Sequence, residues 1–232
     1  MQRSLVTGAN RGIGLELVGQ LLRRGDRVFA ACRSPGKALK LTELAGAHPG
    51  RLSVLPLDLN KERSIAELAR EVAALTDALD LLVNNAGVLV SGERYGELSA
   101  KTVNDTVATN ATGSLLVAQA LTPLLARSDD ARIVNITSEL GSLAATTVFQ
   151  TPSYAISKAA LNMVTRLLAA QLGESGIRVI SVNPGWVKTD MGGARAPVAV
   201  QASVDGIIKL ADGLERGDNG RFFDFGGEEL PW

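Results

Sequence analysis

LVTGANRGIG, residues 5–14, places a short apolar strand directly before a glycine-rich turn, and the apolar residues of a helix follow from Leu15 to Leu22. Glycine permits a tight turn and a close approach of the backbone, and a helix N-terminus attracts an anion. A strand, turn and helix in this order therefore form a phosphate cradle. The glycine spacing is Thr-Gly-x-x-x-Gly-x-Gly rather than G-x-G-x-x-G. A glycine-rich turn by itself is weak evidence for nucleotide binding. Its position between a strand and a helix favours nucleotide binding over a merely tight turn.

The rest of the chain repeats this alternation of strand and helix. Apolar runs predict further strands at residues 27–32, 51–57, 80–83, 132–136, 177–182 and 221–225, and helical spacing predicts helices near 36–47, 64–75, 100–125, 154–172 and 202–214. Strands separated by helices form a parallel sheet with right-handed crossovers. We therefore expect an α/β fold of the Rossmann type, with one domain over residues 1–232 built on a doubly wound, seven-stranded parallel sheet with helices on both faces. Residues 226–232 are expected to be irregular.

Composition argues against several classes of protein. The 24 basic residues balance 24 acidic ones, whereas a non-specific binder of nucleic acid or of anionic membranes carries a clustered basic excess. One cysteine, Cys32, excludes an intrachain disulfide, and one histidine, His48, argues against a metal site. The chain shows no signal-like start and no apolar run near the roughly 18 residues of a membrane span. We therefore expect a soluble, cytoplasmic protein.

Polar or small residues stand where the predicted strands end. Asp58 follows the third strand, Asn84-Asn85-Ala86-Gly87 the fourth, Thr137-Ser138 the fifth, and NPGWVKT (residues 183–189) the sixth. A doubly wound fold gathers these positions into one crevice, which is where such sheets bind ligands. Asp58 could accept from an adenine amine or simply cap a turn or helix. The NNAG segment could border a flat ligand or form an ordinary tight turn.

Asn110 falls in the middle of the predicted 100–125 helix. Asparagine is unfavourable there because its side chain competes for backbone hydrogen bonds. It indicates a bend or a bound water, or it is an asparagine that faces solvent.

The charges after the second strand bear on the choice of cofactor. In NAD-binding relatives of this architecture, an acidic residue near the end of this strand holds the ribose 2′-hydroxyl. Here no acidic residue occurs between Asp26 and Glu43, and Arg33 directly follows the strand. A guanidinium can bind a 2′-phosphate with two hydrogen bonds, and Arg11 could supply a second positive charge. Either arginine alone could equally be a solvated surface residue, but together they favour NADP(H) over NAD(H).

Tyr154-Ala155-Ile156-Ser157-Lys158 begins the predicted 154–172 helix, with Ser153 as its expected cap. Residues four apart lie on one face of a helix. The Lys158 ammonium would therefore favour the Tyr154 phenolate and bring its pKa from about 10 toward the range of a general acid or base. The alternative is a surface pair on an ordinary helix, and the motifs elsewhere in the chain favour the catalytic interpretation. A loop of about fifteen residues precedes this helix, and loops of that length are often functional.

The combined pattern comprises Thr7-Gly8-x3-Gly12-x-Gly14, Asp58, Asn84-Asn85-Ala86-Gly87, Asn110, Ser138, Tyr154-x3-Lys158 and Pro184-Gly185-x3-Thr189. On these motifs the chain resembles the short-chain dehydrogenase/reductase family, in its single-domain branch, over essentially its whole length. More narrowly, TGANRGIGLE near the start, PGWVKTDMGG and the closing GEELPW are similar to the C-factor and sniffer-type carbonyl reductases.

The resemblance implies a role for each matched residue. Tyr154 would donate a proton to a carbonyl oxygen or accept one from an alcohol, and Ser138 would hydrogen-bond that oxygen. Lys158 would bind the nicotinamide ribose and lower the tyrosine pKa, and Asn110 would hold a water that connects Lys158 to solvent. Cofactor contacts would also come from Gly8, Asn10, Arg11, Gly12, Ile13, Arg33, Asp58 (at the adenine amine), Leu59, Asn85, Ala86, Gly87, Pro184, Val187 and Thr189 (the last two at the carboxamide).

Two features depart from the family pattern. Ser138 and Tyr154 are sixteen residues apart, a few more than is common in the family. Residues 191–200, where relatives carry a lid over the substrate, offer little apolar cover. We expect a substrate site built from the loops after residues 87, 138 and 185, and an open pocket for a broad or bulky carbonyl substrate.

The predicted function is that of an NADPH-dependent carbonyl reductase acting on a small-molecule carbonyl or alcohol. The alternative is an NADP(H)-binding signalling or redox-sensing protein of the C-factor type with little turnover. A methyltransferase on a similar sheet is disfavoured by Tyr154-x3-Lys158 together with the NNAG turn. Helices at 103–125 and 154–172 carry apolar residues on more than one face. This predicts a homodimer or homotetramer, although a buried helix in a monomer would show the same pattern.

Overall fold

The computed structural model describes residues 1–232 and contains one sheet of seven strands in the order β3-β2-β1-β4-β5-β6-β7, all paired in parallel. The strands are β1 (Arg3–Thr7), β2 (Arg27–Cys32), β3 (Leu52–Pro56), β4 (Leu81–Asn84), β5 (Arg132–Ile136), β6 (Arg178–Asn183) and β7 (Phe222–Asp224). The strand order reverses between β1 and β4, where a doubly wound sheet opens its ligand crevice. The predicted doubly wound, seven-stranded parallel sheet is confirmed.

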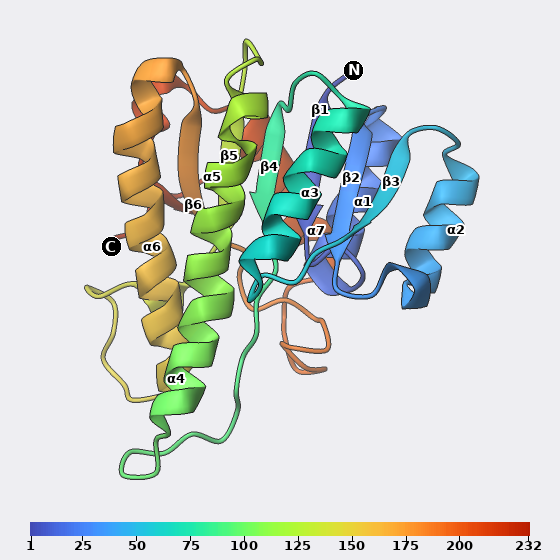
Figure 1. Ribbon diagram of the computed structural model, residues 1–232. Coiled ribbons are helices and arrows are strands. Elements are labelled where there is room, and N and C mark those ends of the chain that lie inside the picture. The colour runs from blue at the N-terminus through green and yellow to red at the C-terminus, as the bar shows by residue number, and fades with distance from the viewer.

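Helices cover both faces of the sheet (Figure 1). α1 (Gly12–Arg24), α2 (Leu39–Ala47) and α7 (Val200–Asp212) pack on one face, and α3 (Glu62–Leu75), α5 (Gly113–Leu125) and α6 (Pro152–Leu172) pack on the other. Each face buries its own apolar cluster, so the strands are covered from both sides, as parallel strands generally are. The single-turn 3-10 helices are η1 (Pro35–Lys37), η3 (Glu139–Gly141), η4 (Gly173–Ser175) and η5 (Arg216–Asp218).

The helix predicted over residues 100–125 is interrupted in its middle. α4 (Ala100–Val107) passes into a π-helical turn, η2 (Ala108–Thr112), before α5 continues. Asn110 lies at the centre of this turn and is fully buried. The expectation that Asn110 marks a distortion of the helix is confirmed. The alternative of a solvent-facing asparagine is wrong because the side chain is directed inward, and π-turns often mark functional sites.

α6 begins at Pro152, two residues earlier than the sequence predicted. Thr151 precedes the helix in the left-handed conformation (φ 40°), and Pro152 takes the first helical position, where proline costs no hydrogen bond. Ser153 is therefore inside the first turn rather than at the cap, so its prediction as the cap was wrong. Its side chain instead donates a hydrogen bond to Glu93.

The segment after β7 forms no helix or strand but is hydrogen-bonded to that strand. Residues 226–232, called the tail below, turn back and run antiparallel to β7. Phe223 and Glu229 form a bridge, and Leu230 N donates to Phe222 O at 2.7 Å. The expectation of an irregular segment is confirmed, since no helix or strand forms after β7. The tail nevertheless pairs with β7 because the backbone hydrogen bonds of this strand at the outer edge of the sheet remain available.

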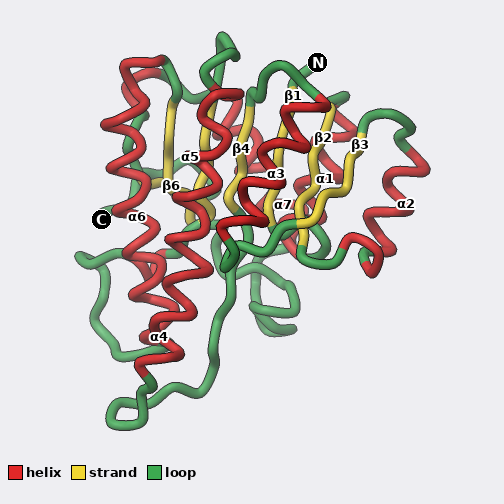
Figure 2. Tube along the Cα trace, in the orientation of Figure 1, coloured by secondary structure: helices red, strands yellow, loops and turns green.

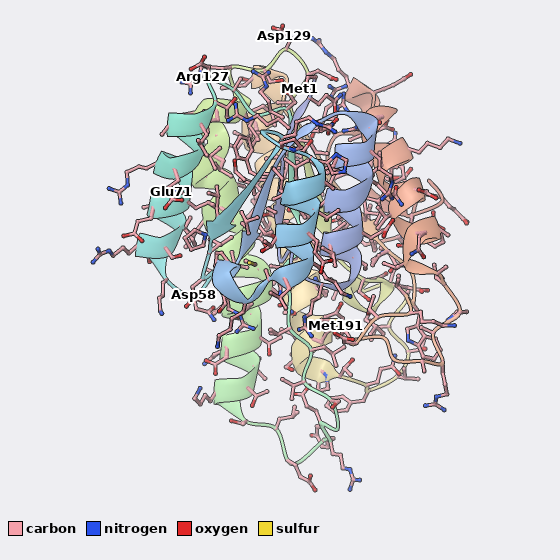
Figure 3. All side chains as sticks on the ribbon, turned by 90° about the vertical axis from the view of Figure 1, so that its right-hand side faces the viewer. Met1, Asp58, Glu71, Arg127, Asp129 and Met191 are labelled. Carbon is pink, nitrogen blue, oxygen red and sulfur yellow. The ribbon has the colours of Figure 1, made fainter.

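The long connections gather at one end of the sheet. Figure 2 shows them as loops beyond the carboxyl ends of the strands: residues 85–99 after β4, 137–151 after β5 and 184–199 after β6. Figure 3 places Asp58 and Met191 toward this end, and Met1, Arg127 and Asp129 at the opposite end. We call the first end the carboxyl edge and the second the amino edge.

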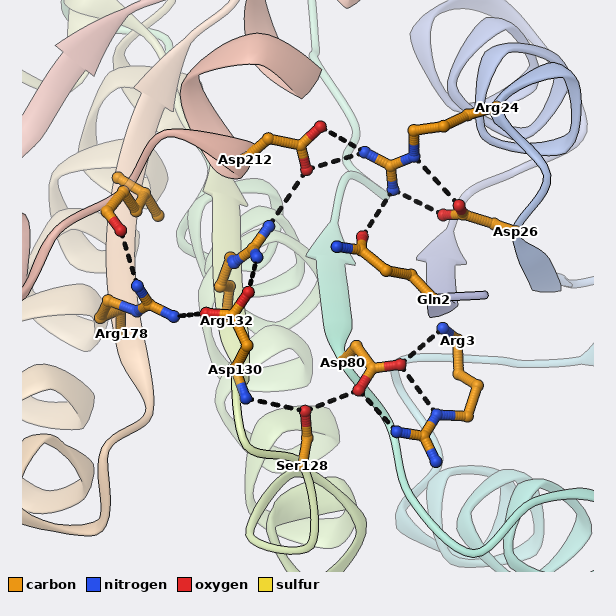
Figure 4. Close-up of polar contacts among 11 residues, drawn as sticks. Gln2, Arg3, Arg24, Asp26, Asp80, Ser128, Asp130, Arg132, Arg178 and Asp212 are labelled. Carbon is orange, nitrogen blue, oxygen red and sulfur yellow. Dashed lines mark hydrogen bonds and ion pairs between the residues drawn. The ribbon is translucent and has the colours of Figure 1, made fainter.

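A network of arginine–aspartate pairs crosses the amino edge (Figure 4). Its members are Arg3, Arg24, Arg132 and Arg178 with Asp26, Asp80, Asp130 and Asp212. In one pair the Arg3 guanidinium donates two hydrogen bonds to the Asp80 carboxylate, at 2.7 and 2.8 Å. Partial burial alone would raise the pKa of Asp80, but hydrogen bonds from Arg3 and Ser128 lower it overall. The arginine and aspartate side chains of this network at the amino edge are therefore paired with residues of opposite charge.

Candidate active site

The glycine turn after β1 packs directly against the segment after β4. Gly8 has a positive φ of 65°, and a Cβ atom at this position would lie 2.8 Å from Ala86 Cα. The Thr7 hydroxyl oxygen accepts hydrogen bonds from Asn85 N (3.0 Å) and Ala86 N (3.1 Å). Only glycine fits at position 8, because any side chain would displace the neighbouring strand end. The glycine turn therefore packs against the segment after β4 without a side chain at position 8.

Asn85 braces this turn with its side chain. Its Nδ2 donates to Thr7 O at 2.9 Å and to Gly8 O at 3.3 Å. Asn84, one residue earlier, donates to Asn135 Oδ1 and Ser114 O. Both hydrogen bonds of the Asn85 amide go to protein, so its contribution to a ligand site is the shape of the turn and of Ala86 beside it.

The N-terminus of α1 has no protein group that caps it. Arg11 is the N-cap residue, no side chain bonds the first amides, and the first turn carries no acidic residue. These amides and the helix dipole favour an anion. The Arg11 guanidinium lies 3.5 Å from Asp190, and Gly12 lies beneath Thr189. The open turn, the uncapped helix and the overhanging 184–199 loop together fit the diphosphate of a dinucleotide.

The residues expected around the adenosine lie at the neighbouring strand ends. Arg33 is exposed after β2, and its charge acts on Asp58 after β3. Partial burial would raise the pKa of Asp58, but Lys61 at 3.1 Å, the Asn60 N–H and Arg33 lower it. Arg33 and Asp58 are thus brought together at the carboxyl edge, while Leu59 is buried in the core. The sequence analysis did not single out Lys61, which could not be distinguished from a surface lysine.

Gly87, Asn110 and Lys158 converge from three separate elements. Asn110 Oδ1 accepts from Val88 N at 2.8 Å, and Asn110 Nδ2 donates to Val88 O and to Ser157 Oγ, both at 2.9 Å. A Cβ atom at Gly87 would lie 3.3 Å from Asn110 Oδ1 and 3.6 Å from Lys158 Nζ. The π-turn at Asn110 therefore directs a side chain that ties the 85–99 loop to the start of α6.

Lys158 is buried, with 3% of its surface exposed, and lies without a carboxylate partner. Its Nζ donates to the backbone carbonyl of Ile136 at 2.7 Å. Burial disfavours the charged form and lowers the pKa of Lys158 to about 8. The ammonium therefore titrates near the physiological range, as is common at functional sites.

Tyr154 lies one turn before Lys158, next to Ser138 at the end of β5. Burial raises the pKa of Tyr154 to about 12, while the Ser138 side chain acts in the opposite direction. The sequence predicted a lowered tyrosine pKa, and in this structure the direction is wrong. The reason is geometric: Lys158 Nζ lies 5.5 Å from the centre of the tyrosine ring and donates to Ile136 O instead. The increase in the Tyr154 pKa caused by burial therefore exceeds any decrease that the Lys158 ammonium causes at this distance.

The 184–199 loop forms the other wall of the crevice. Val187 is buried and pairs with Val198, and the Thr189 hydroxyl accepts from Gly192 N at 3.2 Å. Pro184 is fixed through its carbonyl, which accepts from the buried Ser203 hydroxyl at 2.7 Å. The predicted Pro184, Val187 and Thr189 thus belong to one ordered loop that reaches the glycine turn.

Comparisons with known proteins agree with this geometry. The family model described as short chain dehydrogenase matches residues 2–198. The chain belongs to the short-chain dehydrogenase family. The resemblance stated from the motifs is therefore confirmed, and the protein is an oxidoreductase of that family.

Individual members of the short-chain dehydrogenase family match the chain along most of its length. A carbonyl reductase from chicken fatty liver, solved with NADPH bound, is 37% identical with a TM-score of 0.95, covering 100% of this chain and 99% of that one. Carbonyl reductase Sniffer of D. melanogaster is 34% identical with a TM-score of 0.96, covering 100% of both chains. C-signal of Myxococcus xanthus is 40% identical over 157 residues, which is 68% of this chain and 95% of that protein. The narrower resemblance to C-factor and sniffer-type proteins is thereby confirmed.

A pocket of about 270 Å³ borders the start of α6 in this short-chain dehydrogenase. It is lined by Glu139, Leu140, Ala145, Thr146, Thr147, Val148, Gln150 and Ala155. Two of its lining residues, Glu139 and Ala155, directly follow Ser138 and Tyr154 in the chain, and most of its wall comes from the loop before α6. A second pocket of similar volume lies at the amino edge around Arg24 and Asp212 and includes none of the predicted site residues.

Glu93 is a residue that the sequence analysis missed. Its Oε2 accepts from Ser153 Oγ at 2.7 Å and from Ser153 N at 3.2 Å, so it caps the first turn of α6 from the 85–99 loop. A carboxylate is favourable at a helix N-terminus. The sequence gives no signal for this contact, because Glu93 is 60 residues away from Ser153 and has no motif around it.

No group of three or more His, Cys, Asp or Glu side chains is arranged to hold a metal ion. None of the helices combines the length and the apolar character needed to cross a membrane.

Proposed function

We propose that this protein is an NADPH-dependent oxidoreductase that reduces the carbonyl group of an aldehyde, ketone or quinone to an alcohol, with Tyr154 as general acid/base. The observation that carries the proposal is the convergence of Asn110 and Lys158 beside Gly87, with the Tyr154 ring 5.5 Å from Lys158 Nζ and an uncapped glycine turn in the same crevice. The chicken liver relative, a carbonyl reductase with NADPH bound, supports the same cofactor and substrate class.

The cofactor would lie along the carboxyl edge. Gly8, Gly12 and Ile13 would hold the diphosphate, Arg33 and Arg11 the 2′-phosphate, and Lys158 the nicotinamide ribose. The adenosine would lie between Asp58 and Ala86, and the carboxamide at Val187 and Thr189. When bound, the nicotinamide supplies the hydride, and the protein supplies orientation and a positioned proton.

Tyr154 is the proton donor in this proposal. A pKa of about 12 keeps the phenol protonated at neutral pH, which is the form that reduction requires. The Ser138 oxygen accepts from Leu140 N at 3.2 Å. Its hydroxyl also hydrogen-bonds Tyr154, so in this proposal a substrate oxygen placed between the two groups would receive both hydrogen bonds. Lys158, with a pKa of about 8, is mostly charged at neutral pH. Its ammonium would stabilise the phenolate once it moves from the Ile136 carbonyl toward the phenol.

The test is a titration of the purified protein with NADPH and NADH, followed by turnover on a panel of aldehydes, ketones and quinones. We expect NADPH to bind at least tenfold more tightly than NADH, because two guanidiniums face the 2′-phosphate. Arg33→Ala should remove this preference without changing NADH binding. Equal affinities would overturn the cofactor assignment, and no turnover on any member of the panel would overturn the reaction.

A second candidate is an NADP(H)-binding signalling protein with little turnover. It is favoured by the 40% identity to C-signal of Myxococcus xanthus. The complete set of Asn110, Ser138, Tyr154 and Lys158 weighs against it, because a non-catalytic protein does not need all four. NADPH binding without turnover on the panel would favour this second function.

We also propose that the protein forms a homodimer or homotetramer. Support comes from the exposed apolar side chains Ile156, Met163 and Leu167 on α6. Light scattering during size-exclusion chromatography should give a multiple of the 24.3 kDa chain mass. The double variant Met163→Glu with Leu167→Glu should then shift the protein to the monomer.

A further inference from the structure

The closing sequence GEELPW, residues 227–232, has no role in the site described above, yet it reaches the loop that forms the pocket. We infer that the tail holds the 139–151 loop in position, with Trp232 as a positioning residue for substrate binding. The inference rests on the proposed function, because it assigns the pocket at this loop to the substrate.

The tail is fixed to the sheet along its length. Asp224 N donates to Glu228 O at 2.8 Å, and Leu230 N donates to Phe222 O at 2.7 Å. These bonds close a tight reversal after β7 and set the direction in which the last residues run. The position of the tail is therefore set by its hydrogen bonds to both ends of β7, Phe222 and Asp224.

The Trp232 ring is held by two side chains from different elements. It stacks on Phe222, with ring centres 5.5 Å apart and an interplanar angle of 25°. The guanidinium of Arg166, on α6, lies 5.9 Å from its centre and also donates to Gly220 O. Stacking and a cation–π contact both favour one ring orientation. Trp232 is thus fixed between β7 and the helix that carries Tyr154.

Trp232 then contacts the loop through its backbone. Its carbonyl oxygen accepts a hydrogen bond from Ala144 N at 2.9 Å. Residues 143–150 are all exposed, and their other hydrogen bonds go to Ser142 within the same loop. The bond to Trp232 is the one hydrogen bond that joins this stretch to a residue outside the loop. Apart from it, Phe149 packs edge-on against Tyr95, itself on an exposed loop.

The held residue directly precedes the pocket wall. Ala145, Thr146, Thr147 and Val148 line the pocket, together with Ala155, the residue after Tyr154 in α6. Release of Ala144 would let this wall move while leaving Tyr154, Lys158 and the glycine turn in place. A change at Trp232 should therefore alter substrate binding and leave cofactor binding unchanged.

The experiment compares the wild type with Trp232→Ala and Trp232→Phe. We expect Trp232→Ala to raise KM for the carbonyl substrate about tenfold with kcat and the NADPH Kd within about twofold, and Trp232→Phe to restore KM because it keeps the stacking on Phe222. Hydrogen exchange at the Ala144 amide should be faster in Trp232→Ala. Glu229→Gln is the matched control. It removes an exposed ion pair between the tail residue Glu229 and Arg221, and it should change neither KM nor the exchange rate at Ala144.

Each outcome decides the inference. Unchanged exchange at Ala144 in Trp232→Ala would show that the tail does not hold the loop. Faster exchange with unchanged KM would show that the held loop does not position substrate. Should Trp232→Ala fail to fold, Ala144→Pro removes the same hydrogen bond from an exposed position and should raise KM alike. If the wild type reduced no carbonyl, the proposed function would fail, while the exchange measurement would still decide whether the tail holds the loop.

Discussion

At the amino edge of the sheet, the buried guanidinium of Arg132 binds both Asp130 and Asp212, whereas at the carboxyl edge the buried ammonium of Lys158 binds only a backbone carbonyl. The two cations are similarly buried, at 5% and 3% exposed. Their surroundings differ in whether a carboxylate is within reach. This difference separates a region of paired charges from the region where we propose the active site.

The pKa values follow from that difference. At the amino edge, hydrogen bonds and charges from partners keep Asp80 ionised despite its partial burial. At the carboxyl edge, burial acts without a compensating charge, lowering the pKa of Lys158 to about 8 and raising that of Tyr154 to about 12. Unpaired burial costs stability, which a protein tolerates where the perturbed group is used.

The largest effect should come from Tyr154→Phe at the carboxyl edge. Loss of the proton donor should lower kcat by roughly 10³-fold, within the range known for general acids. NADPH affinity and the thermal midpoint should be unchanged, because the ring is kept. Steady-state kinetics, a fluorescence titration and calorimetry would measure the three quantities, and activity persisting in the variant would refute Tyr154 as the acid.

The opposite result is expected for Asp80→Asn at the amino edge. It leaves Arg3 without its carboxylate and should lower the free energy of unfolding by about 2 kcal/mol, with kcat unchanged. The folded pKa of Asp80 is lowered, so its contribution is present above the unfolded pKa of 3.8 and is lost as the pH falls below it. Urea unfolding at several pH values would measure this. Glu67→Gln, in an exposed pair with Arg63, is the control and should change stability by less than about 0.5 kcal/mol.

Lys158→Met should affect stability in the direction opposite to Asp80→Asn, because it removes a buried charge that has no carboxylate partner. We expect the free energy of unfolding at pH 7 to rise by about 1–2 kcal/mol while activity is lost. The sign follows from linkage: between pH 8 and 10.5 the unfolded lysine binds the proton that the folded one has released, so the stability cost is largest below pH 8. A less stable variant at pH 7 would contradict the account of Lys158.

The pH dependence of the reaction tests the same group in the wild type. In the proposed mechanism reduction needs the Lys158 ammonium, so kcat/KM should be constant below about pH 8 and fall by about tenfold per pH unit above it. A rate profile between pH 6 and 10 at saturating NADPH would show this limb. A profile that stays flat to pH 10 would mean that the charge on Lys158 is not required.

The smallest effect is expected from Glu93→Gln. Glu93 is an acidic residue of the carboxyl edge whose partner is a helix N-terminus instead of a cation. Glutamine keeps an acceptor and loses the charge, so kcat should fall by about threefold and the free energy of unfolding by about 0.5–1 kcal/mol. Glu97→Gln, on the same loop and exposed, should change neither value. An equal effect of both substitutions would exclude a specific capping role.

How far the sequence predicted the site depended on the range of each interaction. The glycine turn, the NNAG segment and Tyr154-x3-Lys158 are local patterns, and the structure brings them to one edge as expected. Asn110 was recognised because an asparagine is unfavourable within a helix. Glu93 and Lys61 were not recognised, because their partners are set by packing and nothing in their neighbours distinguishes them from surface residues.

The sequence by itself determined the alternation of strands and helices, hence the parallel sheet, the edge at which its polar residues meet, and the family. Those features follow from hydrophobic periodicity and from the spacing of motifs, both of which are properties of the linear sequence. Only the tertiary structure decided the direction of the Tyr154 pKa shift, the Glu93 cap on α6 and the contact of Trp232 with Ala144. Each depends on burial or on a contact between residues far apart in the chain, and such distances are fixed only when the chain has packed.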